Sequence, residues 1–166
     1  MTDNSDMRTQ LRPGLWDTVN ERYPGSMIHK DDAVPLARLE KPLSDARLIF
    51  VSSAGVELRD SLPFDVVHPV GDFTFRRVPS DSHPADLAIH QLKYPTSGAQ
   101  RDLNVIYPIE RLQELAGEDA IGGLTENFLS FIGYNMDPDR FEREFAEEIA
   151  AAVVAEHADM ALLAPA

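Results

Sequence analysis

Cysteine is missing from the 166 residues of this sequence, and so is selenocysteine. Disulfides, thiolate zinc sites and thiol catalysis are therefore excluded within the residues given. Neither a G-x-G-x-x-G nor a G-x-x-x-x-G-K-[ST] motif is present, so both phosphate-binding fingerprints of nucleotide cofactors are missing as well. We therefore expect no bound cofactor.

Basic residues and long apolar runs are also scarce. The chain has 15 Lys and Arg against 28 Asp and Glu, a net charge of −13, which disfavours nucleic acid and anionic membranes as partners. No apolar run approaches the roughly 18 to 20 residues that cross a bilayer. The N-terminal stretch MTDNSDMRTQ has acidic residues where a signal peptide is basic and then apolar. These features predict a cytoplasmic protein.

The length and the hydrophobic content of 43% predict one compact domain. We place it at residues 41–166, after an N-terminal arm and linker at 1–40. In the arm, Trp16, Val19 and Tyr23 have near-helical spacing, which indicates a short helix that packs its tryptophan onto the domain. A contact between two copies of the chain, and thus a homo-oligomer, is the alternative.

The apolar pattern of the domain alternates between strands and helices. Leu48 to Val51 is a continuous apolar run, typical of a strand covered on both faces, and predicts a core strand at 47–53. Further strands are expected at 73–78, 86–94, 121–124 and within 158–166, and helices at 108–117 and 138–157. A second apolar piece follows the strand at 121–124, at residues 128–132. The acidic residues of the last helix, including Glu156, are expected on its solvated face. The alternation predicts a three-layer α/β domain, Rossmann-like or flavodoxin-like, with a mostly parallel sheet of about five or six strands.

Polar side chains are concentrated in one segment, from Val78 to Leu112. This segment has little apolar sequence for a core of its own, so we expect it to line a site. Ser53 follows the predicted core strand, and open α/β sheets bind ligands at the carboxyl ends of their strands.

The residue types in this segment occur in several kinds of site, so we compare their spacing with the pattern of each kind. Asp81, His83, Asp86 and His90 have the spacing D-x-H-x2-D-x3-H, which matches no recognised ligand set, and no metal site is predicted. A G-x-S-x-G nucleophile elbow is also missing. Acid/base chemistry stays open, because Asp81, His83, His90 and Asp102 could tune one another if they converge.

A family resemblance extends from about Lys41 to the last residue. It rests on AGVEL, PFD, GDFTFRRVPSD, DLAIHQLKYPTSGAQRDLNVIYPIERLQEL, IGGL, FIGYNMDPDR and ADMALLAPA. Its most specific parts are the H-x3-Y-x-T-S segment with the following Arg-Asp-Leu-Asn, and the start of the helix at Pro108. This pattern resembles selenoprotein B, the substrate-specific component of the glycine, sarcosine, betaine and D-proline reductases.

The resemblance implies a reductive cleavage of a small amino acid or amine derivative. In that family a selenocysteine or cysteine displaces an amine from carbon, and electrons arrive from thioredoxin-type dithiols through partner subunits. A selenolate suits this role because it is ionised at neutral pH and is a strong nucleophile. The matched polar residues would shape the substrate pocket, with Tyr94, Thr96, Ser97 and Asn104 as substrate-binding residues. Ser53, at the end of the predicted core strand, is a further substrate-binding candidate. The resemblance assigns no role to His90 and Asp102, and we hypothesise that His90 donates a proton to the leaving group and that Asp102 orients it.

The chain departs from the family at the nucleophile itself. In the family the strand resembling ADMALLAPA is followed almost at once by the redox residue, whereas the sequence given stops at Ala166. We therefore expect the nucleophile to lie beyond Ala166, and an in-frame UGA codon read as stop would explain its absence. Two alternatives stay open, a redox-dead module that binds a ligand or partner and an acid/base enzyme without redox chemistry.

Overall fold

The computed structural model describes residues 18, 21–22, 24, 37–92 and 94–166. The chain divides into two compact units, residues 1–38 and 39–166, and the description below concerns the second. Trp16, Val19 and Tyr23, on which the predicted N-terminal helix depends, lie outside the described residues.

A five-stranded sheet forms the centre of the second unit, with β1 (Arg47–Ser52) in its middle. The strands that run parallel to β1 and pair with it are β5 (Gly123–Leu124), β6 (Asn127–Phe131) and β7 (Met160–Ala164). An antiparallel edge strand, β3 (Phe75–Pro79), pairs with β6. The register of β7 on β1 sets Leu48 opposite Met160 and Ser52 opposite Ala164. The predicted core strand at 47–53 and the final strand are thereby confirmed.

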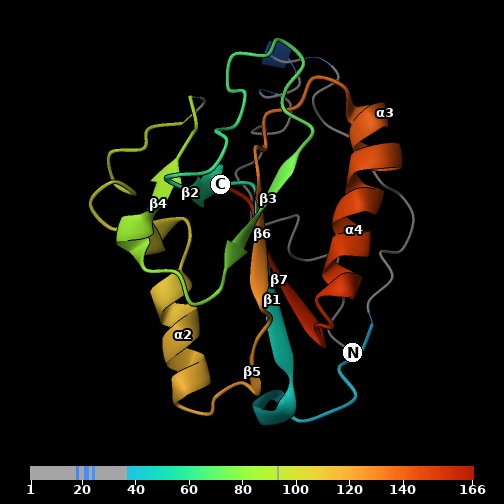
Figure 1. Cartoon of the computed structure of the whole chain (residues 1–166). Helices are drawn as coiled ribbons and strands as arrows, with labels where there is room; N and C mark the ends of the chain where they lie inside the picture. Colours follow the sequence, from blue (N-terminus) through green and yellow to red (C-terminus); the bar gives the residue numbers. More distant parts are fainter. Residues whose placement is uncertain (1–17, 19–20, 23, 25–36, 93) are drawn as a thin grey trace. The chain divides into compact units, whose positions relative to one another are not determined.

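Helices cover both faces of this sheet (Figure 1). α2 (Ile109–Gly117) lies on one face, and a continuous helical segment lies on the other. That segment consists of α3 (Pro138–Arg140), a π-helical turn η6 (Phe141–Phe145) and α4 (Ala146–Ala155). The predicted three-layer α/β architecture with a mostly parallel sheet is confirmed.

Each layer has its own apolar core. On the α2 face, Phe50 packs edge-on against Tyr107 and Phe128, with ring centroids 5.0 and 5.9 Å away. On the α4 face, Ile49 and Val51 pack with other apolar side chains of the sheet and the helix. Because neighbouring residues of β1 point to opposite faces, its continuous apolar run supplies both cores.

The helical segment begins at the residue predicted from the sequence, but one of the acidic residues at its end is not exposed to solvent as predicted. Asp137 caps it by accepting a hydrogen bond from the backbone N–H of Arg140 at 3.0 Å. Glu156 lies just after α4, is only 9% exposed, and accepts hydrogen bonds from the backbone and side chain of Asn127. The prediction that Glu156 lies on the solvated face is therefore wrong, because this carboxylate ties the end of α4 to the start of β6.

A second, smaller sheet carries the polar segment. β2 (Val56–Leu58) pairs antiparallel with β4 (Leu87–Ile89), and Glu57 lies opposite Ala88. The strand predicted at 86–94 is therefore shorter than expected, and His90 follows its end. Three short 3-10 helices, η3 (Leu43–Asp45), η4 (Pro84–Asp86) and η5 (Leu103–Val105), complete the described elements.

None of the helices in the described part of the chain is long and apolar enough to cross a membrane.

Candidate functional site

A hollow of about 650 Å³ lies beside the small sheet, and we call it the histidine pocket. Its lining comes from β4 and the residues that flank it, from the residue after β2, and from the loop that leads into η5. The residues that line it are Arg59, Pro84, Ala85, Leu87, Ala88, Ile89, His90, Ala99, Gln100, Arg101 and Leu103. The pocket thus brings one of the predicted site residues, His90, together with two arginines and a glutamine.

The backbone of His90 is held by Gly55. The N–H of His90 donates to the carbonyl oxygen of Gly55 at 2.8 Å. Gly55 has a φ of +66°, and a Cβ at this position would lie 2.5 Å from the carbonyl oxygen of His90. Only glycine combines this backbone conformation with so close an approach. Position 55 therefore requires glycine to keep His90 in place.

The side chain of His90 contacts a buried carboxylate. Glu57, in the middle of β2, is 1% exposed, and its Oε1 contacts Nδ1 of His90. Its Oε2 accepts a hydrogen bond from the backbone N–H of Phe64 at 3.0 Å and lies 4.0 Å from Nε of Arg76. A buried carboxylate needs such partners because burial removes its hydration. Glu57 therefore belongs to an ionic group that extends from Arg76 to the histidine pocket.

The two edges of the His90 ring have different environments. Nδ1 is buried and has no hydrogen-bond partner among the described residues, apart from its contact with Glu57. The side chain as a whole is 44% exposed, so atoms of the side chain other than Nδ1 form its exposed surface. A histidine whose Nδ1 faces a carboxylate carries its proton there when neutral and leaves Nε2 free to accept one. Nε2 is thus the ring nitrogen that Glu57 leaves without a partner.

Two arginines give the histidine pocket positive charge. Nε of Arg59 donates to the carbonyl oxygen of Ala85 at 2.7 Å, which fixes this guanidinium beside the pocket. Arg101 is exposed, and its side chain makes no hydrogen bond or ion pair within the part of the chain that the structure describes. Guanidinium groups bind carboxylates in a bidentate way. The pocket therefore has groups that could bind a small anion near His90.

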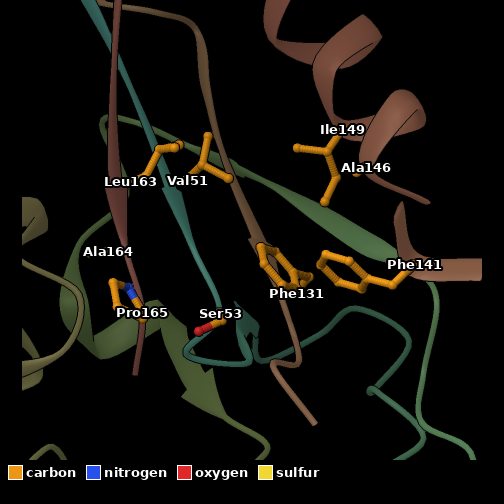
Figure 2. A pocket seen from close by; sticks show the side chains of 9 residues that line it. All are labelled: Val51, Ser53, Phe131, Phe141, Ala146, Ile149, Leu163, Ala164 and Pro165. Atoms are coloured by element: carbon orange, nitrogen blue, oxygen red, sulfur yellow. The ribbon is translucent and has the colours of Figure 1, made fainter. Parts of the chain in front are cut away.

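A second hollow, of about 320 Å³, lies between the sheet and the α4 segment, and we call it the apolar pocket. Its lining residues are Val51, Ser53, Phe131, Phe141, Ala146, Ile149, Leu163, Ala164 and Pro165. Figure 2 shows the rings of Phe131 and Phe141 side by side and the Ser53 hydroxyl near Pro165. The Oγ of Ser53 accepts a hydrogen bond from the backbone N–H of Ala166 at 3.0 Å. Ser53 therefore contacts the residues that follow β7 and lies outside the histidine pocket.

Three of the predicted substrate-binding residues lie in or near the loop between His90 and η5. The hydroxyl of Tyr94 donates to the carbonyl oxygen of Ala54 at 2.9 Å, and burial raises the pKa of this phenol. Thr96 accepts a hydrogen bond from Nε2 of Gln100 at 3.1 Å, and Ser97 is exposed. Thr96 thus orients a side chain of the histidine pocket without lining the pocket itself.

Asp102 and Asn104 form a separate network at the start of α2. Oδ1 of Asp102 accepts hydrogen bonds from the backbone N–H and from Nδ2 of Asn104, both at 3.0 Å. Asn104 in turn donates to Oε2 of Glu110 at 2.6 Å and accepts from the backbone N–H of Glu110 at 3.2 Å. These contacts cap η5 and orient α2. The carboxylate that contacts His90 belongs to Glu57, which is not among the site residues predicted from the sequence.

A signal for Glu57 does exist in the sequence. It is the one charged residue in the apolar stretch Ala54 to Leu58, where a solvated strand would have more. A lone acid in a buried segment needs a partner. The identity of that partner depends on the pairing of β2 with β4, which the local sequence does not specify.

Comparisons with known proteins relate the chain to a reductase subunit. No family model matches the sequence, and no solved structure matches it. D-proline reductase subunit gamma of Acetoanaerobium sticklandii is 31% identical over 123 residues, which cover 74% of this chain and 50% of that protein. The chain thus spans about half the length of this curated relative. It is a distant homologue of a D-proline reductase subunit.

Proposed function

We propose that this chain is a component of a reductase that cleaves a carbon–nitrogen bond of a small amino acid or amine derivative. The observation that carries the proposal is the distant homology to D-proline reductase subunit gamma. The histidine pocket supports it, because an imidazole and two guanidinium groups that line one pocket suit a substrate with an amine and a carboxylate.

The proposed reaction needs a thiol or selenol nucleophile and a dithiol reductant. The thiolate or selenolate attacks the carbon that bears nitrogen, the C–N bond breaks, and the amine leaves with a proton. A thiol then attacks the bound sulfur or selenium, and the carbon leaves with the electron pair and takes a proton. A second thiol releases the nucleophile and forms a disulfide. The substrate gains two electrons and two protons, and the dithiol loses them.

In this reaction His90 is the proposed proton donor to the leaving amine, through Nε2. Arg59 and Arg101 are the proposed partners of a substrate carboxylate, and Gln100 adds a neutral hydrogen-bonding group. All four side chains line the same pocket, so one small substrate could contact the acid and the anion-binding groups together.

The nucleophile is proposed to follow β7. The chain itself contains no cysteine. Ala166 donates to Ser53, and Gly55, two residues after Ser53, bonds to the backbone of His90. A residue that follows Ala166 would therefore start near the carboxyl end of β1, where Gly55 holds the backbone of His90.

The codon after Ala166 tests this placement. A UGA codon there, or a cysteine codon within the next few positions, supports it. A UAA or UAG codon with no downstream cysteine contradicts it.

Turnover tests the reaction class. The gene product that carries its selenocysteine or a cysteine substitute, with any partner subunits, is incubated with D-proline and a dithiol, and 5-aminopentanoate is measured. Glycine, sarcosine and betaine serve as further substrates. His90→Ala should lower kcat by roughly 10²- to 10⁴-fold, whereas His68→Ala, outside the histidine pocket, should leave it unchanged. Failure of the wild-type protein to reduce any of these substrates would contradict the proposal.

A binding module of the same family is the second candidate, because a cysteine-free chain can hold a ligand without reducing it. This candidate predicts heat of binding in calorimetry with D-proline or a partner subunit, and no turnover under the conditions above. The loss of that heat in Arg101→Gln would assign the ligand to the histidine pocket.

A further inference from the structure

Glu57 is the most deeply buried charged side chain near the histidine pocket, with 1% of its surface exposed. Its two oxygens have separate partners. Oε2 accepts from Phe64 N–H and faces Arg76, whereas Oε1 contacts Nδ1 of His90. From this division we propose that Glu57 is a positioning residue that fixes the tautomer and the orientation of the His90 ring. The part of the proposal that concerns proton transfer rests on the proposed function.

Arg76 is held in place on the far side of Glu57. Its Nε donates to the carbonyl oxygen of Leu62 at 3.1 Å, and its Nη1 donates to Oγ1 of Thr74 at 2.8 Å. The guanidinium carbon lies 4.2 Å from the centre of the Phe64 ring. Because the backbone N–H of Phe64 and the guanidinium of Arg76 are both held in place, Oε2 of Glu57 cannot rotate toward His90 without losing these two partners. Oε1 is therefore the oxygen left for the imidazole.

The imidazole has the complementary requirement. Nδ1 is buried and contacts no polar group other than Glu57 among the described residues. A buried nitrogen without a partner is unfavourable, so the neutral ring places its proton on Nδ1, toward the carboxylate. Nε2 is then the nitrogen that takes up and releases the proton that the reaction uses.

Substitution of Glu57 by glutamine gives this proposal a specific readout. Phe64 N–H and Arg76 both need an acceptor, so the amide oxygen takes the position of Oε2, and the amide NH2 faces His90. An NH2 group donates and cannot accept from Nδ1–H. The neutral ring should therefore change to the tautomer with its proton on Nε2.

The experiment is a long-range ¹H–¹⁵N NMR correlation of the His90 ring in the full chain at about pH 8.5, where an ordinary imidazole is neutral. In the wild-type protein we expect Nδ1 to be the protonated nitrogen, and in Glu57→Gln we expect Nε2. The control is Glu114→Gln on α2, which should keep the wild-type pattern. A wild-type ring protonated on Nε2 would overturn the proposal even if the variant does not fold, and so would an unchanged tautomer in a folded Glu57→Gln.

A kinetic measurement separates this proposal from the proposed function. In an active reductase, Glu57→Gln should lower kcat at least about tenfold with less than about a threefold change in KM. An unchanged kcat together with a changed tautomer would overturn the catalytic half of the proposal. If the wild-type protein shows no reductase activity but the tautomer changes as expected, the proposed function fails and the positioning of His90 by Glu57 stands.

Discussion

Gly55 is the residue on which the position of His90 depends most directly. Substitution by alanine would require a side chain at a φ of +66° and would place Cβ 2.5 Å from the His90 carbonyl oxygen. We expect Gly55→Ala to lower the free energy of unfolding in urea by about 1 to 3 kcal/mol. The ring signals of His90 should shift in the same variant.

Gly98 provides the matched control for this substitution. A Cβ at Gly98 would meet nothing within 4 Å. Gly98→Ala should therefore change the free energy of unfolding by less than about 1 kcal/mol and leave the His90 signals in place. Equal effects of the two substitutions would mean that the close approach of residues 55 and 90 is not a constraint.

Tyr107 and Tyr94 differ in whether their hydroxyls have a partner. The Tyr107 hydroxyl is buried and has no hydrogen-bond partner among the described residues, whereas Tyr94 donates to the Ala54 carbonyl. Tyr107→Phe should therefore leave the free energy of unfolding unchanged or raise it by up to about 1 kcal/mol, and Tyr94→Phe should lower it by about 0.5 to 1.5 kcal/mol. Parallel urea titrations measure both. A loss in Tyr107→Phe as large as that in Tyr94→Phe would show that the Tyr107 hydroxyl has a partner.

The dependence of folding stability on alkaline pH is a second test of the buried Tyr107 hydroxyl. Burial raises the pKa of Tyr107 above its ordinary value of 10.0, so the unfolded chain loses this proton at lower pH than the folded chain. The stability from the neutral phenol is fully present below about pH 10 and is lost as the pH rises further. Tyr107→Phe should therefore reduce the alkaline fall in stability.

The residues of the candidate site were only partly accessible from the sequence. The polar surroundings of His90 in the sequence make it a candidate, and it lines the histidine pocket. Its role as a proton donor stays a prediction. Its partner was placed at Asp102, which lies nearby in sequence, whereas the structure sets Glu57 against it. That contact follows from the pairing of Val56–Leu58 with Leu87–Ile89, a long-range register that no local pattern encodes.

At the scale of elements, the local sequence predicts a strand or helix correctly where the structure of that segment does not depend on a distant partner. The apolar run of β1 and the Asp137–Pro138 start of the long helical segment were predicted correctly. β4 was predicted too long because its length depends on its partner, and β2 offers only three residues for pairing. The π-helical turn at Phe141–Phe145 has no local signal, and the contacts of Phe141 and Phe145 with Phe131 accompany it.

The start of β7 depends on Asp159. Its carboxylate accepts a hydrogen bond from the backbone N–H of Arg47 at 2.9 Å and pairs with Lys41 at 2.8 Å. These contacts, the backbone hydrogen bond first, lower the pKa of Asp159 below its ordinary value of 3.8. The stability from this carboxylate is therefore present above about pH 4 and is lost as the pH falls through the lowered pKa.

Asp159→Asn should make the protein less stable at pH 7 and less sensitive to acid below pH 4. Thermal unfolding followed by circular dichroism from pH 7 to pH 3 measures both effects. Asp60→Asn is the control, because Asp60 is exposed and its side chain has no hydrogen bond or ion pair in the described part of the chain. An equal loss in the two variants at pH 7 would show that Asp159 does not anchor β7.

At the scale of the whole molecule, two features act in opposite directions on association between copies. The net charge of −13 repels a second copy. β7 pairs only with β1 among the described strands, and it exposes 41% of Leu162 and 69% of Leu163. An apolar edge strand with free backbone groups favours pairing with another chain.

We therefore expect self-association that depends on salt. At about 0.1 M NaCl the screening length is roughly 10 Å, and at about 1 M it is roughly 3 Å, so high salt removes much of the repulsion and leaves the apolar edge. Sedimentation velocity should show larger species at high salt, and Leu163→Lys should restore the monomer because a charged residue protects an edge strand. Leu62→Lys is the control, because Leu62 is 79% exposed but lies outside the strands. A monomer at both salt concentrations would rule out association through β7, and so would equal effects of the two lysine substitutions. The repulsion between acidic surfaces would then be the dominant effect on association between copies of this chain.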